Sequence, residues 1–233
     1  MPETGRHAST AVTRSASVLF AVLPTAHPAP AAALQWPGDF TGRLAALALL
    51  ETLNAELLSH PSATATLEHW CAEHKLAPTP KVTAELVRED RPLPQADRAR
   101  LQLAPGEPVH HRRVKLRCSG VVLSEADNWY VPSRLTPEMN RLLQQTDTPF
   151  GRAVAELDFT RQTLSAELLW RPLPEGWEME PVVRGSADPM PVPDFVLRHR
   201  AVLYTSQHLP FSEVVESYTS AVLAFPPSAL RGR

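Results

Sequence analysis

Two adjacent arginines, Arg112 and Arg113, have the chemistry to bind an acidic small molecule. They lie in the segment VHHRRVKLRC (109–118), whose alternating pattern predicts a strand. A guanidinium presents a planar fork of donors, which matches a carboxylate better than the point charge of lysine does. Alternation places Arg112 on the apolar face of this strand and Arg113 on the opposite face. A buried Arg112 would require an anion, so both arginines are candidates for the same role.

The corner TPFGR (148–152) is a second candidate for contact with a ligand. Pro149 has no N–H, so the free amides at this corner belong to Phe150 and Gly151. Because Gly151 has no Cβ, it would let a ligand approach the backbone closely. The plainer alternative is a corner that only ends the preceding helix, with Gly151 in the left-handed conformation.

Two glutamates in the segment SEVVES (212–217) are candidates for proton transfer. Glu213 and Glu216 are three residues apart, so they point to opposite faces of a strand unless a bulge intervenes. Proton transfer near neutral pH requires a carboxyl group whose pKa is raised by burial. The pattern alone leaves both glutamates open.

The periodicity of the chain predicts an α+β fold that would position these residues. Helices are expected over 41–59, 62–76 and 137–145, the second capped by Ser62 or Thr64 and the third by Thr136. Strands are expected over 81–89, 109–118, 121–131, 159–170, 196–204 and 211–225. Short connections between several of these strands, such as Ser119-Gly120, favour an antiparallel sheet with helices at its N-terminus and midway. We expect this domain to span residues 41–228.

Residues 1–40 have the composition of a leader. Arg6 and Arg14 precede an apolar stretch, SASVLFAVLPTA (15–26), and the small residues APAAA (29–33) follow. This three-part pattern is typical of a secretory signal peptide and predicts a periplasmic or secreted protein. The alternative is a disordered leader on a cytoplasmic protein. The apolar stretch is too short to anchor the chain stably in a membrane.

Composition and motifs narrow the function further. A net charge of −2 argues against a nucleic-acid-binding protein, which needs excess cations. The crowded segment EHWCAEH (68–74) lacks the His-Glu-x-x-His arrangement, so no metal is expected. Cys71 and Cys118 would permit one disulfide in an oxidising compartment, but two cysteines are also a common count for reduced thiols.

The order of these landmarks resembles chorismate lyase, whose fold is shared with the ligand-binding UTRA domain of bacterial transcription regulators. The resemblance covers about residues 45–225 and is most specific at TPFGR, which is similar to the family's Thr-Pro-Leu-Gly-Arg corner. It implies that Arg113 and the N–H of Phe150 hold the substrate carboxylate. It also implies that Glu213 lies at the ether and hydroxyl end of the ring. A second arginine of the family is Asn128 in this chain.

The resemblance implies a chorismate pyruvate-lyase, which releases pyruvate from chorismate to leave 4-hydroxybenzoate, a step of ubiquinone biosynthesis, with no cofactor. The alternative function is a non-catalytic, UTRA-like domain that binds a small aromatic carboxylate. Asn128 in place of a charged contact and the predicted export favour this alternative. The expected partner is a small aromatic or cyclohexadienyl carboxylate, with no nucleic acid and no stable membrane insertion, and the expected state is a monomer.

Overall fold

The computed structural model describes residues 1, 35–179, 186 and 188–225. The apolar core of the expected signal peptide and the last three residues of the expected domain lie outside this part. The helices are α1 (Phe40–Ser59), α2 (Ala63–Glu73), α3 (Gln95–Arg98), α4 (Pro137–Gln145) and α5 (Phe150–Ala153). The strands are β1 (Val82–Val87), β2 (His110–Cys118), β3 (Val121–Tyr130), β4 (Thr160–Leu168), β5 (Phe195–Tyr204) and β6 (Pro210–Thr219).

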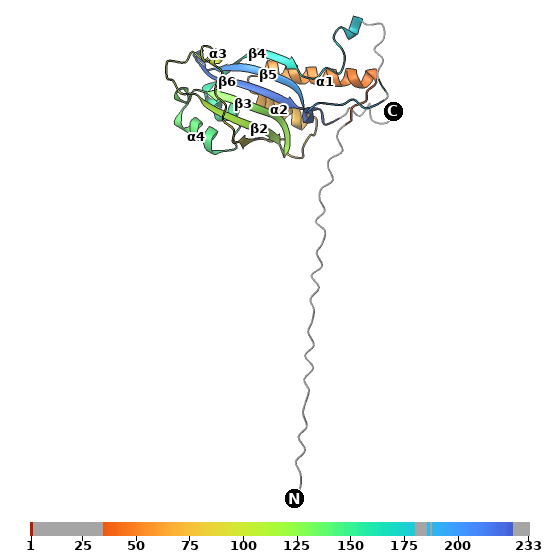
Figure 1. The fold of residues 1–233 in the computed structure, drawn as a ribbon, viewed down its shortest axis with the longest axis horizontal. Coiled ribbons are helices and arrows are strands. Elements are labelled where there is room, and N and C mark those ends of the chain that lie inside the picture. Colours follow the sequence, from red (N-terminus) through yellow and green to blue (C-terminus); the bar gives the residue numbers. More distant parts are fainter. Residues whose placement is uncertain (2–34, 180–185, 187, 226–233) are drawn as a thin grey trace. The chain divides into compact units, whose positions relative to one another are not determined.

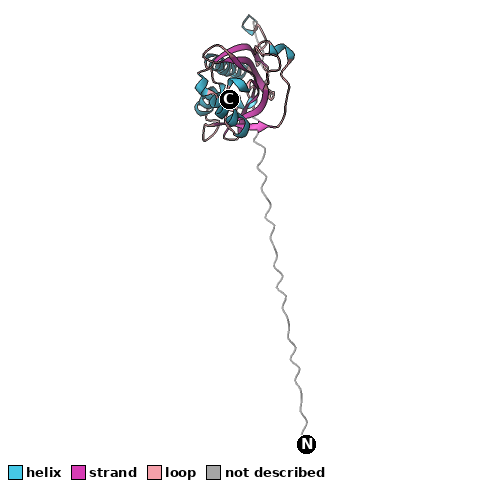
Figure 2. Ribbon diagram, turned by 90° about the vertical axis from the view of Figure 1, so that its left-hand side faces the viewer, coloured by secondary structure: helices cyan, strands magenta, loops and turns pink. Residues whose placement is uncertain are grey.

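The strands form one antiparallel sheet in the order β1-β2-β3-β6-β5-β4, which confirms the predicted α+β fold. Helices α1 and α2 lie on one face of the sheet, behind the strands in Figure 1. The strands curve around these helices, as Figure 2 shows. The inner face is therefore concave and covered, whereas much of the outer face carries charged side chains.

Helix positions follow from apolar spacing and from capping residues. Leu50, Leu53 and Leu57 of α1 are buried against the sheet, as the spacing predicts. Ser62 caps α2 by accepting a hydrogen bond from the N–H of Ala65, and Thr136 caps α4 in the same way. In the described part of the chain, no helix combines the length and the apolarity needed to cross a bilayer.

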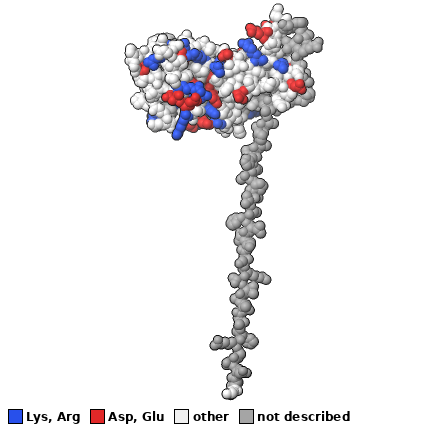
Figure 3. Space-filling view, viewed as in Figure 1, with Lys and Arg blue, Asp and Glu red and all other residues white. Residues whose placement is uncertain are grey.

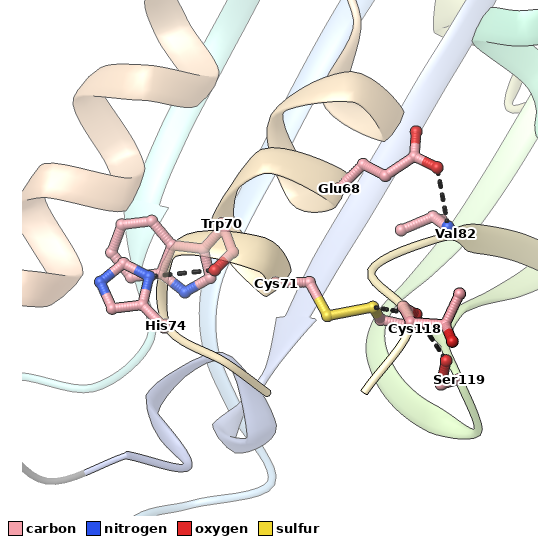
Figure 4. Close-up of a disulfide and its surroundings, with 8 residues drawn as sticks. Glu68, Trp70, Cys71, His74, Val82, Cys118 and Ser119 are labelled. Atoms are coloured by element: carbon pink, nitrogen blue, oxygen red, sulfur yellow. Dashed lines mark hydrogen bonds between the residues drawn. A yellow bond between two sulfur atoms is a disulfide. The ribbon is translucent and has the colours of Figure 1, made fainter. Parts of the chain in front are cut away.

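A disulfide between Cys71 and Cys118 joins α2 to the end of β2 (Figure 4). Both cysteines are fully buried. The indole N–H of Trp70, next to Cys71, donates to the carbonyl of Val222. The covalent bond and the indole together fix α2 against the sheet.

The last strand is shorter than the predicted 211–225. It ends at Thr219, and a 3-10 helix follows over Ser220–Leu223. The side chain of Thr219 begins this turn by accepting from the N–H of Ala221. Because the carbonyls of this turn accept from two buried indoles, Trp36 and Trp70, the turn is built into the core.

Packed structure also begins earlier than residue 41. Trp36 is fully buried and pairs with Met190 in an isolated antiparallel bridge. Residues 35–40 therefore pack as part of the domain, although they fall within the expected leader. The remaining leader residues after Met1 lie outside the described part of the chain.

Candidate functional site

A pocket opens on the concave face of the sheet, between the N-terminal turn of α2 and the short helix α5. The pocket has a free volume of about 400 Å³ when its open mouth is included. The enclosed space is about 30 Å³. Most of the wall is apolar. The lining side chains come from Ala63, Val114, Leu116, Ala126, Phe150, Phe159, Leu203 and Val214, with Ser62, Thr64, Asn128, Arg161 and Glu216 as polar members.

The TPFGR corner forms the roof of this pocket. Phe150 and Gly151 both line it, and they form the first turn of α5. A Cβ on Gly151 would lie 3.1 Å from the Oγ of Ser62, so glycine permits the close approach of α5 to α2. Because Gly151 is within a helical turn and has a negative φ, the alternative of a left-handed glycine that ends a helix is wrong.

The polar end of the pocket is a buried ion pair between β4 and β6. The Nη2 of Arg161 donates to the Oε2 of Glu216 at 2.7 Å, and the hydroxyl of Tyr218 donates to the same oxygen at 3.2 Å. Burial tends to lower the pKa of Arg161, but the charge and hydrogen bond of Glu216 together with Tyr218 outweigh this effect, and the pKa is raised. The Nε of Arg161 is buried and has no hydrogen-bond partner among the described residues. Glu216 lines the pocket, and both of these hydrogen bonds go to Oε2 rather than to its second oxygen, Oε1.

Arg112 lies beside the pocket, directly opposite Asn128 on the neighbouring strand. Its Nε donates to the carbonyl of Leu143 at 2.8 Å, and its Nη2 donates to that of Thr148 at 2.9 Å. It therefore holds the connection between α4 and α5, and with it the roof of the pocket. Burial lowers the pKa of Arg112 to about 10. Its Nη1 is buried without a partner, and no acidic side chain among the described residues forms a salt bridge with it.

Arg112 also borders a second, more open hollow at the end of β1. The volume of this hollow is about 580 Å³, and it is lined in part by His110, Tyr130 and Gln144. Its wall includes Leu86, which is 42% exposed. Arg112 lines this open groove and reaches the first pocket only through its strand neighbour Asn128, which lines that pocket.

Arg113 and Glu213 lie on the other face of the sheet. Arg113 donates to Asp127 and to Glu125, each at 2.8 Å. Glu213 is fully buried under the segment that contains α3 and accepts from Arg200 at 2.6 Å. The strands thus bring Arg112, Asn128, Phe150, Gly151 and Glu216 to one face and leave Arg113 and Glu213 on the other.

The outer face over β2 and β3 carries side chains of opposite charge next to one another, which Figure 3 shows as interleaved blue and red side chains. Lys115 lies 3.7 Å from Glu125, which already pairs with Arg113. Arg113 is paired there with three carboxylates, those of Glu89, Glu125 and Asp127, so it does not need a further anion.

Three residues of the concave face, Arg161, His199 and Tyr218, were not identified from the sequence. Arg161 belongs to a strand without apolar alternation, so nothing in the local pattern marks it as buried. His199 and Tyr218 are fully buried in β5 and β6. A period-two reading anchored on Glu216 places Tyr218 on the same face, and this is the one signal that could have found it.

His199 is buried as a neutral side chain behind the ion pair. Its Nε2 donates to the Oδ1 of Asn54 at 2.8 Å, and its Nδ1 has no partner among the described residues. Burial lowers its pKa to about 4, although Glu216 acts in the opposite direction and Arg161 adds to the lowering.

The stability of the protein should therefore fall between pH 7 and pH 5. In this range the unfolded chain binds a proton at His199 and the folded chain does not, so unfolding becomes more favourable as the pH falls. We expect a loss of about 2 kcal/mol in the free energy of unfolding, measured by urea denaturation. The variant His199→Gln should lack this part of the pH dependence. An equal slope in both proteins would contradict the assignment.

The fold and the pocket define a class: an α+β domain with a small, largely apolar pocket that contains buried polar groups. No family model matches the chain. The chain is 53% identical over 201 residues to the uncharacterized protein y4mC of Sinorhizobium fredii (strain NBRC 101917 / NGR234), and the match covers 84% of each protein. The chain therefore belongs to the same family as y4mC.

Solved structures give weaker matches. PhnF of Mycobacterium smegmatis matches 69% of this chain with a TM-score of 0.41 and 15% identity, and YydK of Bacillus subtilis matches 59% with a TM-score of 0.36 and 16% identity. The ligand-binding domain of a GntR-family regulator from Bordetella bronchiseptica matches 60% with a TM-score of 0.37 and 19% identity, and 83% of that domain is covered. The chain spans 64% of PhnF and 57% of YydK. At these TM-scores the likenesses support no functional argument.

Proposed function

We propose that the chain is a small-molecule-binding domain whose ligand is a carboxylate built on a single ring. The observation that carries this proposal is the pair of buried guanidiniums, Arg112 and Arg161, of which only Arg161 has an acidic partner among the described residues. A buried charge without a counter-ion is costly, so an anion would stabilise this face. The apolar wall suits a ring. The enclosed space is about 30 Å³, smaller than the roughly 150 Å³ of a cavity that holds benzene, so a bound ring would lie partly in the open mouth of the pocket.

The pocket elements suggest an orientation for such a ligand. The carboxylate would lie near Asn128 and the corner formed by Phe150 and Gly151, in the field of Arg112. The opposite end of the ring would face Glu216. In this arrangement Arg112 and Glu216 carry the roles that the resemblance suggests for Arg113 and Glu213.

The resemblance also implies lyase activity, which is a more specific function than ligand binding. Elimination of pyruvate would require a carboxyl group that transfers a proton at the substrate. Glu216 is the glutamate placed in the pocket, and one of its oxygens is already occupied by Arg161 and Tyr218. We therefore propose binding without turnover, and we expect no pyruvate release from chorismate in a coupled assay.

Calorimetry with 4-hydroxybenzoate tests the proposal. We expect binding to the protein, and we expect Val214→Phe to abolish it, because a phenyl ring at this position fills the pocket. Val215→Phe places the same group on the opposite face of β6 and should leave affinity within about threefold, because residue 215 does not line the pocket. Unchanged affinity in Val214→Phe would place the ligand elsewhere.

Export to an oxidising compartment is the remaining part of the proposal. The bond between Cys71 and Cys118 supports it, because structural disulfides persist mainly in secreted and periplasmic proteins. Fractionation of cells that express the full chain tests it, and a protein confined to the cytoplasm would contradict it.

A further inference from the structure

The charges around the pocket add up to one unbalanced cation. Arg161 and Glu216 form a pair, and Arg112 has no acidic partner in the described part of the chain. The other polar lining residues, Ser62, Thr64 and Asn128, are neutral. A ligand with one negative charge would therefore neutralise the site completely.

Asn128 separates the two charged groups. It lies directly opposite Arg112 on one side and diagonally next to Glu216 on the other, at a typical Cα separation of about 7–8 Å. Asn128 is only 2% exposed, and its side chain lines the pocket without a hydrogen bond to any described residue. Because an amide both donates and accepts, Asn128 can bind a ligand oxygen without adding charge.

Glu216 gives a negative charge to the end of the pocket that lies opposite Arg112. Its Oε2 is saturated by Arg161 and Tyr218, which fixes the carboxylate in one orientation. The second oxygen, Oε1, can accept a hydrogen bond from a ligand but cannot donate one. A second negative group at this end would meet a like charge in a water-poor environment, where repulsion is strong.

We propose that the pocket selects monoanionic carboxylates that carry an uncharged hydrogen-bond donor opposite the acid, and that it rejects dianions of the same shape. This inference rests on the proposed function, because it concerns the charge of the ligand in the same pocket. It excludes doubly charged ring acids as ligands, including those of suitable size.

Two isosteric ligands test the selection: 4-carbamoylbenzoate, a monoanion with an amide donor, and terephthalate, a dianion at pH 7. Calorimetry of the wild-type protein should show affinity for 4-carbamoylbenzoate that is higher by at least about 30-fold. In Glu216→Gln the difference should shrink to about threefold, because the amide removes the like charge. Glu125→Gln makes the same chemical change on the outer face and should keep the full difference.

The outcomes separate the two proposals. If the wild-type protein binds both ligands with equal affinity, the charge selection is wrong and the binding function stands. If it binds neither ligand but binds 4-hydroxybenzoate, the charge selection is wrong and the binding function stands. If it also fails to bind 4-hydroxybenzoate, both proposals are overturned. If Glu216→Gln does not fold, Asn128→Asp serves instead: it adds a negative charge in the same shape and should weaken binding of 4-carbamoylbenzoate by about tenfold or more. Unchanged affinity in Asn128→Asp would overturn the selection.

Discussion

Replacement of Arg112 by methionine should abolish ligand binding and also lower the stability of the protein. Methionine keeps the length of the side chain but leaves the buried carbonyls of Leu143 and Thr148 without their donor. Each lost bond to a charged donor costs about 1.5–3 kcal/mol, and removal of an unpaired buried charge offsets part of this. We expect a net loss of about 3 kcal/mol in the free energy of unfolding, and at least a 100-fold loss of affinity for 4-hydroxybenzoate, since both the cation and the fixed roof are lost.

The neighbouring residue provides the control. Arg113→Met removes the same group from the opposite face, where its partners Glu89, Glu125 and Asp127 are partly exposed. We expect a change in stability of about 1 kcal/mol or less and no change in affinity beyond about threefold. If Arg113→Met abolishes binding and Arg112→Met does not, the ligand lies on the outer face and the proposed site is wrong.

Loss of the disulfide should have the second large effect. The bond closes a loop between residues 47 positions apart, and the chain-entropy relation for a loop of this length gives about 4 kcal/mol. The double variant Cys71→Ala/Cys118→Ala should therefore unfold at a markedly lower urea concentration. Reductant should shift the wild-type protein toward the same midpoint and leave the double variant unchanged.

A thiol assay tests whether the bond exists in the purified protein. Denatured but unreduced protein should show no free thiol, because the two cysteines of the chain are paired. Two reactive thiols per chain would show that the bond is absent, and the stability effect would then not be expected.

The three long helices and strand β2 could be predicted because each has a local signal. Alternation in the segment 109–118 gives both the strand and the opposite facing of its two arginines, which the structure has. Helix α5 could not be predicted because four residues carry no period. Strand β6 ends at Thr219 and the following turn is held by the indoles of Trp36 and Trp70, which donate to the carbonyls of Leu223 and Val222. These indoles are far away in the sequence, so the local sequence does not contain this information.

The residues that line the pocket were harder to predict than the positions of the strands. Period two places Glu213 and Glu216 on opposite faces, but it does not show which face the helices cover. The structure settles this facing because α1 and α2 lie on the face that bears Glu216. Arg161 joins the pocket through pairing of β4 at the far edge of the sheet, which is a long-range feature.

A crystal structure of the protein with bound 4-hydroxybenzoate is the most direct test of the central claim. We expect the ring to lie on the concave face between Val214 and Phe150. Its carboxylate should lie toward Asn128 and Arg112, and its hydroxyl should lie within hydrogen-bond distance of Glu216. A ligand bound only in the open groove beside His110 and Gln144, or an empty pocket at saturating ligand, would contradict the account.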